Sequence, residues 1–311
     1  MRPIILGVVG DSATGKTTIS KGIAQILGKD RVTVICTDNY HRFDREQRKE
    51  LKISALHPSC NYINIMEQHL NLLKKGCPIL SPIYNHSTGT FDAPVYIQPT
   101  DFVIIEGLLG FHSHDLRDHF DVKVYLDPPE DLRVTWKLNR DTTKRGYKKD
   151  EVLAILKKRE ELSEKYIRAQ KQWSDIIVQF YPKESEKVNA QLNVKLLLRS
   201  TLAHPDLNEV VNNSNGDSKP SIRLNVGRYH DRLTEFLDVS DHVESEQVKR
   251  IKEILVQYIP ELEYLPSKEL GIYTKGTDRN HSETLAIAQM LIVYQLLVTE
   301  KVLRTRLEER F

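Results

Sequence analysis

The chain has 311 residues, of which 40% are hydrophobic and 28% are charged, and its formal net charge is +2. This length accommodates one large α/β domain or two small ones with an ample core. The nearly balanced charge argues against nucleic acid or an anionic membrane surface as a partner. We expect no membrane-spanning segment, because no apolar run resembles one long enough to cross a bilayer. We expect no signal or transit peptide, because an apolar strand begins within three residues of the first Met. Three cysteines without metal-ligand spacing suit a reducing cytoplasm, where we expect the protein to reside.

Strands and helices alternate through the first half of the chain. Short apolar or β-branched runs predict five strands, at residues 4–9, 32–35, 102–105, 122–126 and 176–180. Helical spacing of apolar residues predicts helices after the first strand, over 63–75, after Pro129 and, as a long charged stretch, over 149–172. Buried strands separated by helices imply a parallel sheet covered on both faces, which binds its ligands at the carboxyl ends of the strands.

The pattern changes after about residue 182. Apolar and polar residues alternate over 192–199 and 222–226, which predicts antiparallel strands with one solvated face. We interpret the polar segment 208–220 between them as a loop, and residues 243–258 and 282–306 as amphipathic helices. We therefore expect a core over 1–185 and an extension over 186–311 that packs on it as one structural unit.

A phosphate-binding loop follows the first predicted strand. The pattern G-x-x-x-x-G-K-[ST] is matched by Gly10, Asp11, Ser12, Ala13, Thr14, Gly15, Lys16 and Thr17. Because a helix starts there, with Thr18 in its first turn, unpaired backbone N–H groups form an anion site at its positive end. Lys16 can reach the β- and γ-phosphates of ATP, and the Thr17 hydroxyl can ligate Mg²⁺. The alternative, a chance match in a turn, is disfavoured by the flanking strand and helix, so the sequence predicts a nucleoside triphosphate ligand.

Asp38 follows the second predicted strand and is therefore placed beside the phosphate loop. If the segment is helical, Asp38, His41 and Arg45 share one face. The carboxylate could then accept the proton of a substrate hydroxyl, while His41 and Arg45 hold a polar or anionic acceptor. The alternative is a solvated, charged turn in which Asp38 caps a helix.

Glu106 stands at the tip of the third predicted strand. In phosphate-loop proteins a metal-orienting carboxylate occupies this place, and the adjacent Gly107 permits close approach of the backbone to a ligand. A strand-end acid can also be an ordinary loop residue. With the phosphate loop present, we favour a role with Thr17 in holding the metal.

A basic segment covers residues 137–147. Lys137, Arg140, Lys144 and Arg145 cluster around the single acid Asp141 and precede a glycine. Such a segment can close over ATP and place Arg140 and Arg145 on the transferring phosphate. The alternative is an exposed basic helix end with an Asp141–Arg145 ion pair, and a weak exposed pair contributes little to stability.

The segment Pro82-Ile83-Tyr84-Asn85-His86 is the last feature that we single out. A lone histidine in a loop is more often structural or solvated than functional. From the residues alone, we therefore read it as a loop without an assigned role.

Taken together, these stretches resemble the phosphoribulokinase family, within the phosphoribulokinase and uridine kinase superfamily. The matching segments come in the family's order over roughly residues 4–182, and they read GDSATGKTT, TVICTDNYHRFDREQRKE, ALHPSCNYINIMEQ, SPIYNHSTGTFD, VIIEGL, RDTTKRGY and YIRAQKQWSDIIVQ. The resemblance implies a P-loop NTP hydrolase-like α/β fold: a parallel or mixed sheet flanked by helices. It also implies ATP- and Mg²⁺-dependent phosphorylation of the 1-hydroxyl of D-ribulose 5-phosphate, which gives D-ribulose 1,5-bisphosphate and ADP.

The resemblance assigns a role to each matching residue. Asp38 matches the family's proposed catalytic base, and Glu106 matches the Walker B acid. The nucleotide and metal positions fall on the phosphate loop, at Lys16 and Thr17. Residues that we assign to the sugar-phosphate pocket are His41, Arg45, Tyr84 and His86. Those that match the lid are Lys137, which we expect to bind the substrate, Arg140 and Asp141, which we expect to be catalytic with Asp38 and Lys16, and Arg145, which we expect to bind the nucleotide.

Three departures from the family pattern bear on regulation and specificity. Light-regulated members carry a cysteine pair that forms a disulfide switch, whereas here Thr14 takes the first position and only Cys36 remains, so we expect no such switch. Asn39 stands where the family often has a second acid. Beyond about residue 185 the match to plant and cyanobacterial enzymes fades, which leaves acceptor choice and oligomeric contacts open.

We expect a small-molecule sugar phosphate as substrate, and a homo-oligomer, in the form of a dimer. Two other interpretations stay open. The same machinery could serve a kinase of uridine or of another small hydroxyl acceptor. The chain could also be a nucleotide-binding regulator without catalysis.

Overall fold

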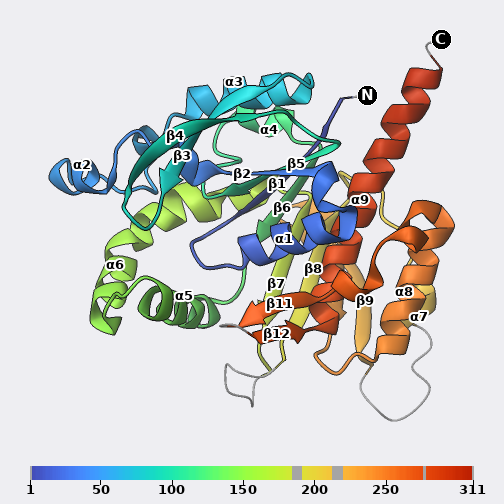
Figure 1. The fold of residues 1–311 in the computed structure, drawn as a ribbon. Coiled ribbons are helices and arrows are strands. Elements are labelled where there is room, and N and C mark those ends of the chain that lie inside the picture. Colours follow the sequence, from blue (N-terminus) through green and yellow to red (C-terminus); the bar gives the residue numbers. More distant parts are fainter. Residues whose placement is uncertain (1, 184–190, 212–219, 276–277, 310–311) are drawn as a thin grey trace.

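The computed structural model of the chain describes residues 2–183, 191–211, 220–275 and 278–309. Eight strands form one sheet in the order β2-β5-β1-β6-β7-β8-β10-β9 (Figure 1). The first five pair in parallel and span Val32–Cys36 (β2), Phe102–Gly107 (β5), Ile4–Gly10 (β1), Val122–Leu126 (β6) and Ile176–Tyr181 (β7). The other three add antiparallel and span Asn193–Arg199 (β8), Arg232–Val239 (β10) and Ile222–Tyr229 (β9). The predicted parallel or mixed sheet is thus confirmed.

Side chains alternate between the two faces of the central strand β1, which is buried along its whole length. Leu6 and Val8 belong to the core cluster that includes α1 (Lys16–Leu27) and α9 (Glu283–Glu308). Ile5 and Val9 belong to the opposite cluster, with residues of α3 (Ile63–Lys74) and α4 (His114–His119). Figure 1 shows these helix pairs on the two sides of the sheet. Helices therefore cover both faces, as buried parallel strands require.

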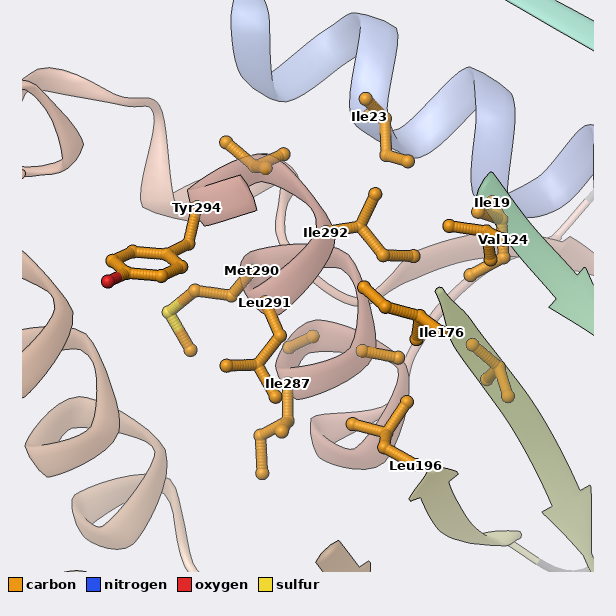
Figure 2. Packing of buried hydrophobic residues seen from close by; sticks show 14 of the residues in the cluster. Ile19, Ile23, Val124, Ile176, Leu196, Ile287, Met290, Leu291, Ile292 and Tyr294 are labelled. Carbon is orange, nitrogen blue, oxygen red and sulfur yellow. The ribbon is translucent and has the colours of Figure 1, made fainter. Parts of the chain in front are cut away.

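Helix α9 is buried on all sides over most of its length, although the sequence predicted an apolar stripe on one side. Ile287, Leu291 and Ile292 are each at most 2% exposed. Figure 2 shows Ile292 pointing toward Ile19 and Ile23 of α1, whereas Leu291, Ile287, Met290 and Tyr294 lie on other sides of the helix. The helix α8 (Ser245–Tyr258) packs on α9 as well, so no side of this part of α9 faces water.

The expectation that no segment could span a membrane was wrong on length and composition. Residues Glu283–Arg306 of α9 form a helix long and apolar enough to do so. Within the apolar window, however, 78% of the residues are buried inside the protein. The central core helix of a globular domain has the same composition as a membrane span, because both are surrounded by apolar groups.

Several elements differ from those predicted. Residues 82–85 are not a loop, because β3 (Ile79–Asn85) pairs with β4 (Thr90–Ile97) as an antiparallel hairpin, whereas His86 lies in the turn between these strands. The long charged helix ends early: α6 (Lys149–Leu162) is followed by a π-helical turn over Ser163–Ile167 and a 3₁₀ segment over Arg168–Trp173. The segment 208–220 begins with a short helix α7 (Asn208–Val211), and residues 212–219 lie outside the described residues.

Short elements complete the chain. Two more helices are α2 (Arg45–Glu50) and α5 (Glu130–Lys144), and a small hairpin is formed by β11 (Ile272–Lys275) and β12 (Asp278–His281). The 3₁₀ turns span Lys29–Arg31, Thr37–Tyr40, Pro58–Cys60, Pro260–Tyr264 and Ser267–Glu269.

The C-terminal segment continues the sheet of the first half instead of starting a separate one. Strand β8 pairs with β7 from Ile176↔Leu198 to Tyr181↔Asn193. Helix α9 packs on α1, β1 and β8, so it contacts both halves of the chain. We propose on this basis that residues 1–185 and 186–311 form one structural unit.

Candidate active site

The phosphate-binding loop connects β1 to α1, as the sequence predicted. Ala13 and Gly15 have positive φ angles of 68° and 94°, which turn the backbone into the first turn of α1. The Lys16 ammonium donates hydrogen bonds to the carbonyls of Gly10 (3.0 Å) and Asp11 (2.7 Å). Burial lowers the pKa of Lys16, while neighbouring carboxylates act in the opposite direction. One lysine and a helix N-terminus thus meet at a site suited to phosphate.

Thr14 stabilises the loop from within. It is buried, and its hydroxyl donates a hydrogen bond to the Asp11 carbonyl at 3.0 Å. All three cysteines lie in the described part of the chain and are free. Burial raises the pKa of Cys36 well above its usual value, with Asp38 and Glu106 acting in the same direction, so its thiol is poorly ionised. Thr14 supplies no thiol at this position, so the absence of a disulfide switch stays an expectation.

Glu106 lies at the carboxyl end of β5, beside the phosphate loop. The Thr17 hydroxyl donates a hydrogen bond to Glu106 Oε1 at 3.1 Å. Glu106 is 8% exposed, and its other oxygen, Oε2, has no hydrogen-bond partner among the described residues. Leaving a buried carboxylate oxygen unsatisfied is costly, whereas a hard cation with oxygen ligands would satisfy it. The residues present therefore fit Mg²⁺, with Thr17 and Glu106 as its holders.

Gly107 allows Glu106 to occupy this position. A Cβ atom at Gly107 would collide with the side chain of Thr37, whose hydroxyl accepts a hydrogen bond from the Leu108 N–H at 3.1 Å. Strand β5 therefore approaches the turn after β2 more closely than any other residue would permit. This contact brings the ends of β2 and β5 together, and with them Asp38 and Glu106.

Asp38 lies in the 3₁₀ turn after β2, close to the β3–β4 hairpin. Its Oδ2 atom is 3.4 Å from His86 Nε2, and the His86 carbonyl accepts a hydrogen bond from Arg45 Nη2 at 2.5 Å. The prediction of one helix carrying Asp38, His41 and Arg45 was wrong, because the backbone is extended at His41 and α2 begins only at Arg45. The alternative of Asp38 as a helix cap was also wrong, since Asp44 caps α2. The hairpin, rather than a helix, brings Arg45 near Asp38.

His41 and Tyr84 are buried between the Asp38 turn and the hairpin. His41 Nδ1 is 2.7 Å from the Asn61 side-chain oxygen, and its ring lies edge-on to Tyr84 with centroids 4.9 Å apart. Burial lowers the pKa of His41, although Asp38 acts in the opposite direction, so the imidazole is neutral at pH 7. The Asn39 side chain accepts a hydrogen bond from the Tyr84 N–H at 3.1 Å. Asn39 thus anchors the hairpin where the family often has an acid.

The first part of the basic segment 137–147 lies against the phosphate loop, whereas Thr142, Thr143, Arg145 and Gly146 at its end are exposed. Asp141 accepts hydrogen bonds from Lys137 (2.7 Å) and Arg140 (2.9 Å), and Arg145 is 3.6 Å away. Arg140 also donates a hydrogen bond to the Ser12 hydroxyl at 3.2 Å. Lys137 and Arg140 therefore reach the loop, and with Arg145 they outnumber the carboxylate of Asp141, which leaves positive charge beside the site of an ATP phosphate.

Lys137 and Asp141 are both buried, and burial perturbs both groups. Burial lowers the pKa of Lys137 to about 8, against the opposing hydrogen bond with Asp141. Burial acts to raise the pKa of Asp141, but hydrogen bonds from Arg140 and Lys137 outweigh it and lower the pKa. Lys137 Nζ is 3.5 Å from the Ser12 hydroxyl, so it lies on the side of the phosphate loop rather than of the hairpin. We therefore place Lys137 nearer the nucleotide than the acceptor. The sequence had assigned it to the acceptor.

Several residues of this site were not predicted from the sequence. The Asp11 carboxylate accepts a hydrogen bond from the buried Ser163 hydroxyl and lies 3.5 Å from Arg133 and 3.6 Å from Arg168. The π-helical turn after α6 places Ser163 there, and no local pattern predicts such a turn. Arg48 lies within a matching segment but had no predicted role. The Asp11 contacts join the phosphate loop to α5 and α6.

Comparison with known proteins decides the family. The model of the Phosphoribulokinase / Uridine kinase family matches residues 5–186. The chain belongs to this family. The match covers the strands, the phosphate loop, the hairpin and the basic segment that build the site, and it ends before β8.

Curated members of the phosphoribulokinase / uridine kinase family resemble the chain at moderate identity. Phosphoribulokinase of Synechocystis sp. is 37% identical over 198 residues, which are 63% of this chain and 60% of that protein. The chloroplastic phosphoribulokinase of Arabidopsis thaliana is 34% identical over 196 residues, which are 58% of this chain and 50% of that protein. A uridine kinase of Lactobacillus helveticus is 32% identical over 182 residues, 57% of this chain and 86% of that protein. The match thus spans only 50–60% of the length of these phosphoribulokinases.

A solved structure shows the same fold. Phosphoribulokinase from Rhodobacter spheroides superposes with a TM-score of 0.59 and 18% identity, covering 85% of this chain and 99% of that chain. The coverage extends beyond the part that the family model matches. The predicted P-loop kinase fold of this family is therefore confirmed, and it includes antiparallel strands in the C-terminal third.

Proposed function

We propose that the chain is an ATP- and Mg²⁺-dependent kinase that phosphorylates the 1-hydroxyl of D-ribulose 5-phosphate. The products are D-ribulose 1,5-bisphosphate and ADP. The observation that carries the proposal is the position of Asp38, between the phosphate loop and a basic pocket. Its charge acts on the ammonium of half-buried Lys16, and His86 Nε2 lies 3.4 Å from Asp38 Oδ2. An acceptor in the pocket would therefore meet the γ-phosphate at this carboxylate.

In this proposal Asp38 is the general base. As the acceptor oxygen attacks the γ-phosphorus, the Asp38 carboxylate takes the hydroxyl proton, and the bond from the γ-phosphorus to the ADP oxygen breaks. His86 neighbours Asp38, and burial lowers the pKa of this imidazole, while Asp38 acts in the opposite direction. A neutral His86 can orient the carboxylate by a hydrogen bond without protonating it.

Cations of the lid and the phosphate loop would neutralise the charge that develops on the transferred group. Lys16 reaches over the loop, and Arg140 and Arg145 project from α5 beside Asp141. Mg²⁺, when bound by Thr17 and Glu106, supplies further charge neutralisation at the β- and γ-phosphates. Binding of ATP would exchange the Asp141 contacts of these arginines for phosphate oxygens, because both are charge-assisted hydrogen bonds.

The acceptor would lie between the Asp38 turn and the β3–β4 hairpin. Buried His41 and Tyr84 and exposed Arg45 and His86 are the side chains that would surround the acceptor there. The permanent positive charge of Arg45 at this place suits a phosphorylated acceptor better than a neutral nucleoside. We propose further that the enzyme acts in the cytoplasm as a homodimer, with no nucleic acid or membrane partner.

The experiment is ADP release measured with ribulose 5-phosphate, uridine, pantothenate and glycerate as acceptors. We expect activity with ribulose 5-phosphate and a loss of at least about a hundredfold in kcat for Asp38→Asn, because general bases contribute roughly 10²–10⁴-fold. Activity confined to a non-phosphorylated acceptor would refute the substrate. Turnover that is absent with every acceptor, in protein that binds ATP, would support a regulator instead.

A further inference from the structure

Two short segments beside the proposed acceptor pocket pair through their backbones. His41, after the Asp38 turn, and Asn61 form an isolated antiparallel bridge. A backbone hydrogen bond lies on each side of this bridge, from Tyr62 N–H to the Tyr40 carbonyl (2.7 Å) and from Arg42 N–H to the Cys60 carbonyl (2.8 Å). In an antiparallel pair without hydrogen bonds of its own, the two opposite side chains lie on the same face at close range. The backbone therefore sets the Asn61 amide beside the His41 imidazole.

The Asn61 amide can take only one orientation in this position. Its Nδ2 atom donates hydrogen bonds to the Ala55 carbonyl at 3.1 Å and to the His57 carbonyl at 3.0 Å. If the amide were turned over, its oxygen would face two carbonyl oxygens, and none of these three atoms can donate a hydrogen bond. Asn61 is only 8% exposed, so an unsatisfied amide would be costly there. The Asn61 oxygen Oδ1 therefore faces His41 and acts as an acceptor.

This acceptor decides which nitrogen of His41 carries the proton. His41 Nδ1 is 2.7 Å from Asn61 Oδ1, and because an amide oxygen cannot donate, Nδ1 must be the donor. The ring holds only this one proton: burial lowers its pKa, Arg48 and His86 act in the same direction, and the opposing charge of Asp38 does not outweigh them. The other ring nitrogen, Nε2, therefore carries a free lone pair.

His41 Nε2 is open to a ligand. It has no hydrogen-bond partner among the described residues, and it is not one of the partnerless polar atoms that are shut off from solvent. The ring lies edge-on to Tyr84 of the hairpin and senses the charge of Asp38, so it faces the place proposed for the acceptor. A neutral nitrogen with a lone pair accepts a hydrogen bond from a hydroxyl group, whereas phosphate oxygens, which also accept, would not pair with it.

We propose that Asn61 is a positioning residue that fixes His41 in the Nδ1–H tautomer, and that His41 Nε2 accepts a hydrogen bond from a hydroxyl group of the acceptor. The second part rests on the proposed function, because it requires a hydroxylated acceptor in this pocket. The amide is anchored on two carbonyls, so the lone pair is in place before the acceptor arrives and no proton has to move when it binds. Such a site discriminates against an acceptor without this hydroxyl, because the nitrogen would be left without a donor.

Nitrogen NMR of the full chain, isotopically labelled in its histidine nitrogens, tests the tautomer without turnover. The His41 resonances are those that disappear in His41→Asn. At neutral pH we expect Nδ1 to resonate as a protonated nitrogen and Nε2 as an unprotonated one. In Asn61→Leu, which removes the acceptor at similar volume, the two resonances should move toward a common average. An Nε2–H tautomer or an imidazolium in the wild type would overturn the inference, as would wild-type His41 resonances in folded Asn61→Leu, and both would leave the proposed function intact.

Steady-state kinetics with ribulose 5-phosphate test the hydroxyl contact. His41→Asn and Asn61→Leu should raise the KM for this acceptor about three- to tenfold, as for loss of one neutral hydrogen bond, while kcat and the KM for ATP change less than about threefold. His41→Gln brings an amide oxygen near the position of Nε2 and should recover part of the affinity, which a merely structural role would not predict. The matched control is Asn71→Leu, at an exposed position of α3, which should change none of these constants.

Thermal melting shows whether each variant is folded. If Asn61→Leu does not fold, the wild-type spectrum and the two His41 variants still decide the inference. An unchanged acceptor KM in folded His41→Asn would overturn the hydroxyl contact but leave the proposed function intact. A wild-type chain that does not phosphorylate ribulose 5-phosphate would overturn the proposed function itself, whereas the NMR spectrum would still decide the tautomer.

Discussion

The buried Lys137 predicts an alkaline limit to the activity that one substitution should remove. The pKa of Lys137 is lowered to about 8 by burial, against the opposing hydrogen bond with Asp141. The protonated amine is the form that can donate to phosphate, so its fraction falls from one half at pH 8 to about one tenth at pH 9. We therefore expect kcat/KM for ATP to fall about tenfold for each pH unit above roughly 8.

The assay is ADP release between pH 6.5 and 9.5 at low and saturating ATP. Bound phosphate raises the pKa of a neighbouring ammonium, so the decline should shift to higher pH in kcat than in kcat/KM, which reports the enzyme before ATP binds. Lys137→Arg keeps its charge over this range and should abolish the alkaline decline. Lys157→Arg, at an exposed position of α6, is the matched control and should leave it in place. An alkaline limb that persists unchanged in Lys137→Arg would refute the reasoning and point to Lys16 instead.

The remaining predictions concern the metal site, the strand ends, the core and stability against pH. Glu106→Gln should raise the Mg²⁺ concentration for half-maximal activity at least about tenfold, measured by Mg²⁺ titration of ADP release, because an amide is a weaker ligand than a carboxylate. Gly107→Ala should lower the unfolding free energy by about 1–3 kcal/mol in urea, since its Cβ collides with Thr37, and an unchanged midpoint would contradict the close contact. Ile292→Ala should cost about 2–5 kcal/mol, whereas Val302→Ala, at an exposed position of the same helix, should cost less than about 0.5 kcal/mol. Lys137 binds its proton less tightly in the folded than in the unfolded chain, so its contribution to the unfolding free energy should increase from pH 8 to about pH 10.5. The measurement is the difference in unfolding free energy between the wild type and Lys137→Met. A difference that stays constant over this pH range would disprove the prediction.

The phosphate loop and the parallel strands were predictable because their information is local. A β-branched run, a glycine-rich turn and helical spacing follow one another within about 25 residues, and each reports a backbone preference of its own segment. The carboxyl ends of parallel strands meet at one edge of a sheet, so the sequence alone was enough to place Asp38 and Glu106 near Lys16. The resemblance to a family then supplied roles for these residues.

Pairing between distant segments could not be predicted in the same way. The β3–β4 hairpin contains Pro82 and Pro94 and a register shift between Ser81 and Ile83, so its strands lack the regular alternation that would reveal them. Strand β4 is also exposed on both faces, which removes the apolar signal. The position of His86 beside Asp38 depends on this hairpin, so local pattern could not predict it, and only the resemblance to the family assigned His86 to the site.

The sequence by itself determined the ligand class, the strand ends that carry the site and the family, because these depend on contiguous motifs. The tertiary structure decided which charges are compensated. Asp11 accepts a hydrogen bond from Ser163 and lies near two arginines from segments more than 100 residues away, whereas Glu106 Oε2 is buried without a hydrogen-bond partner among the described residues. The charge of a side chain can be read from the sequence. Whether another side chain or only a bound ligand neutralises it depends on contacts between distant segments, which local patterns do not encode.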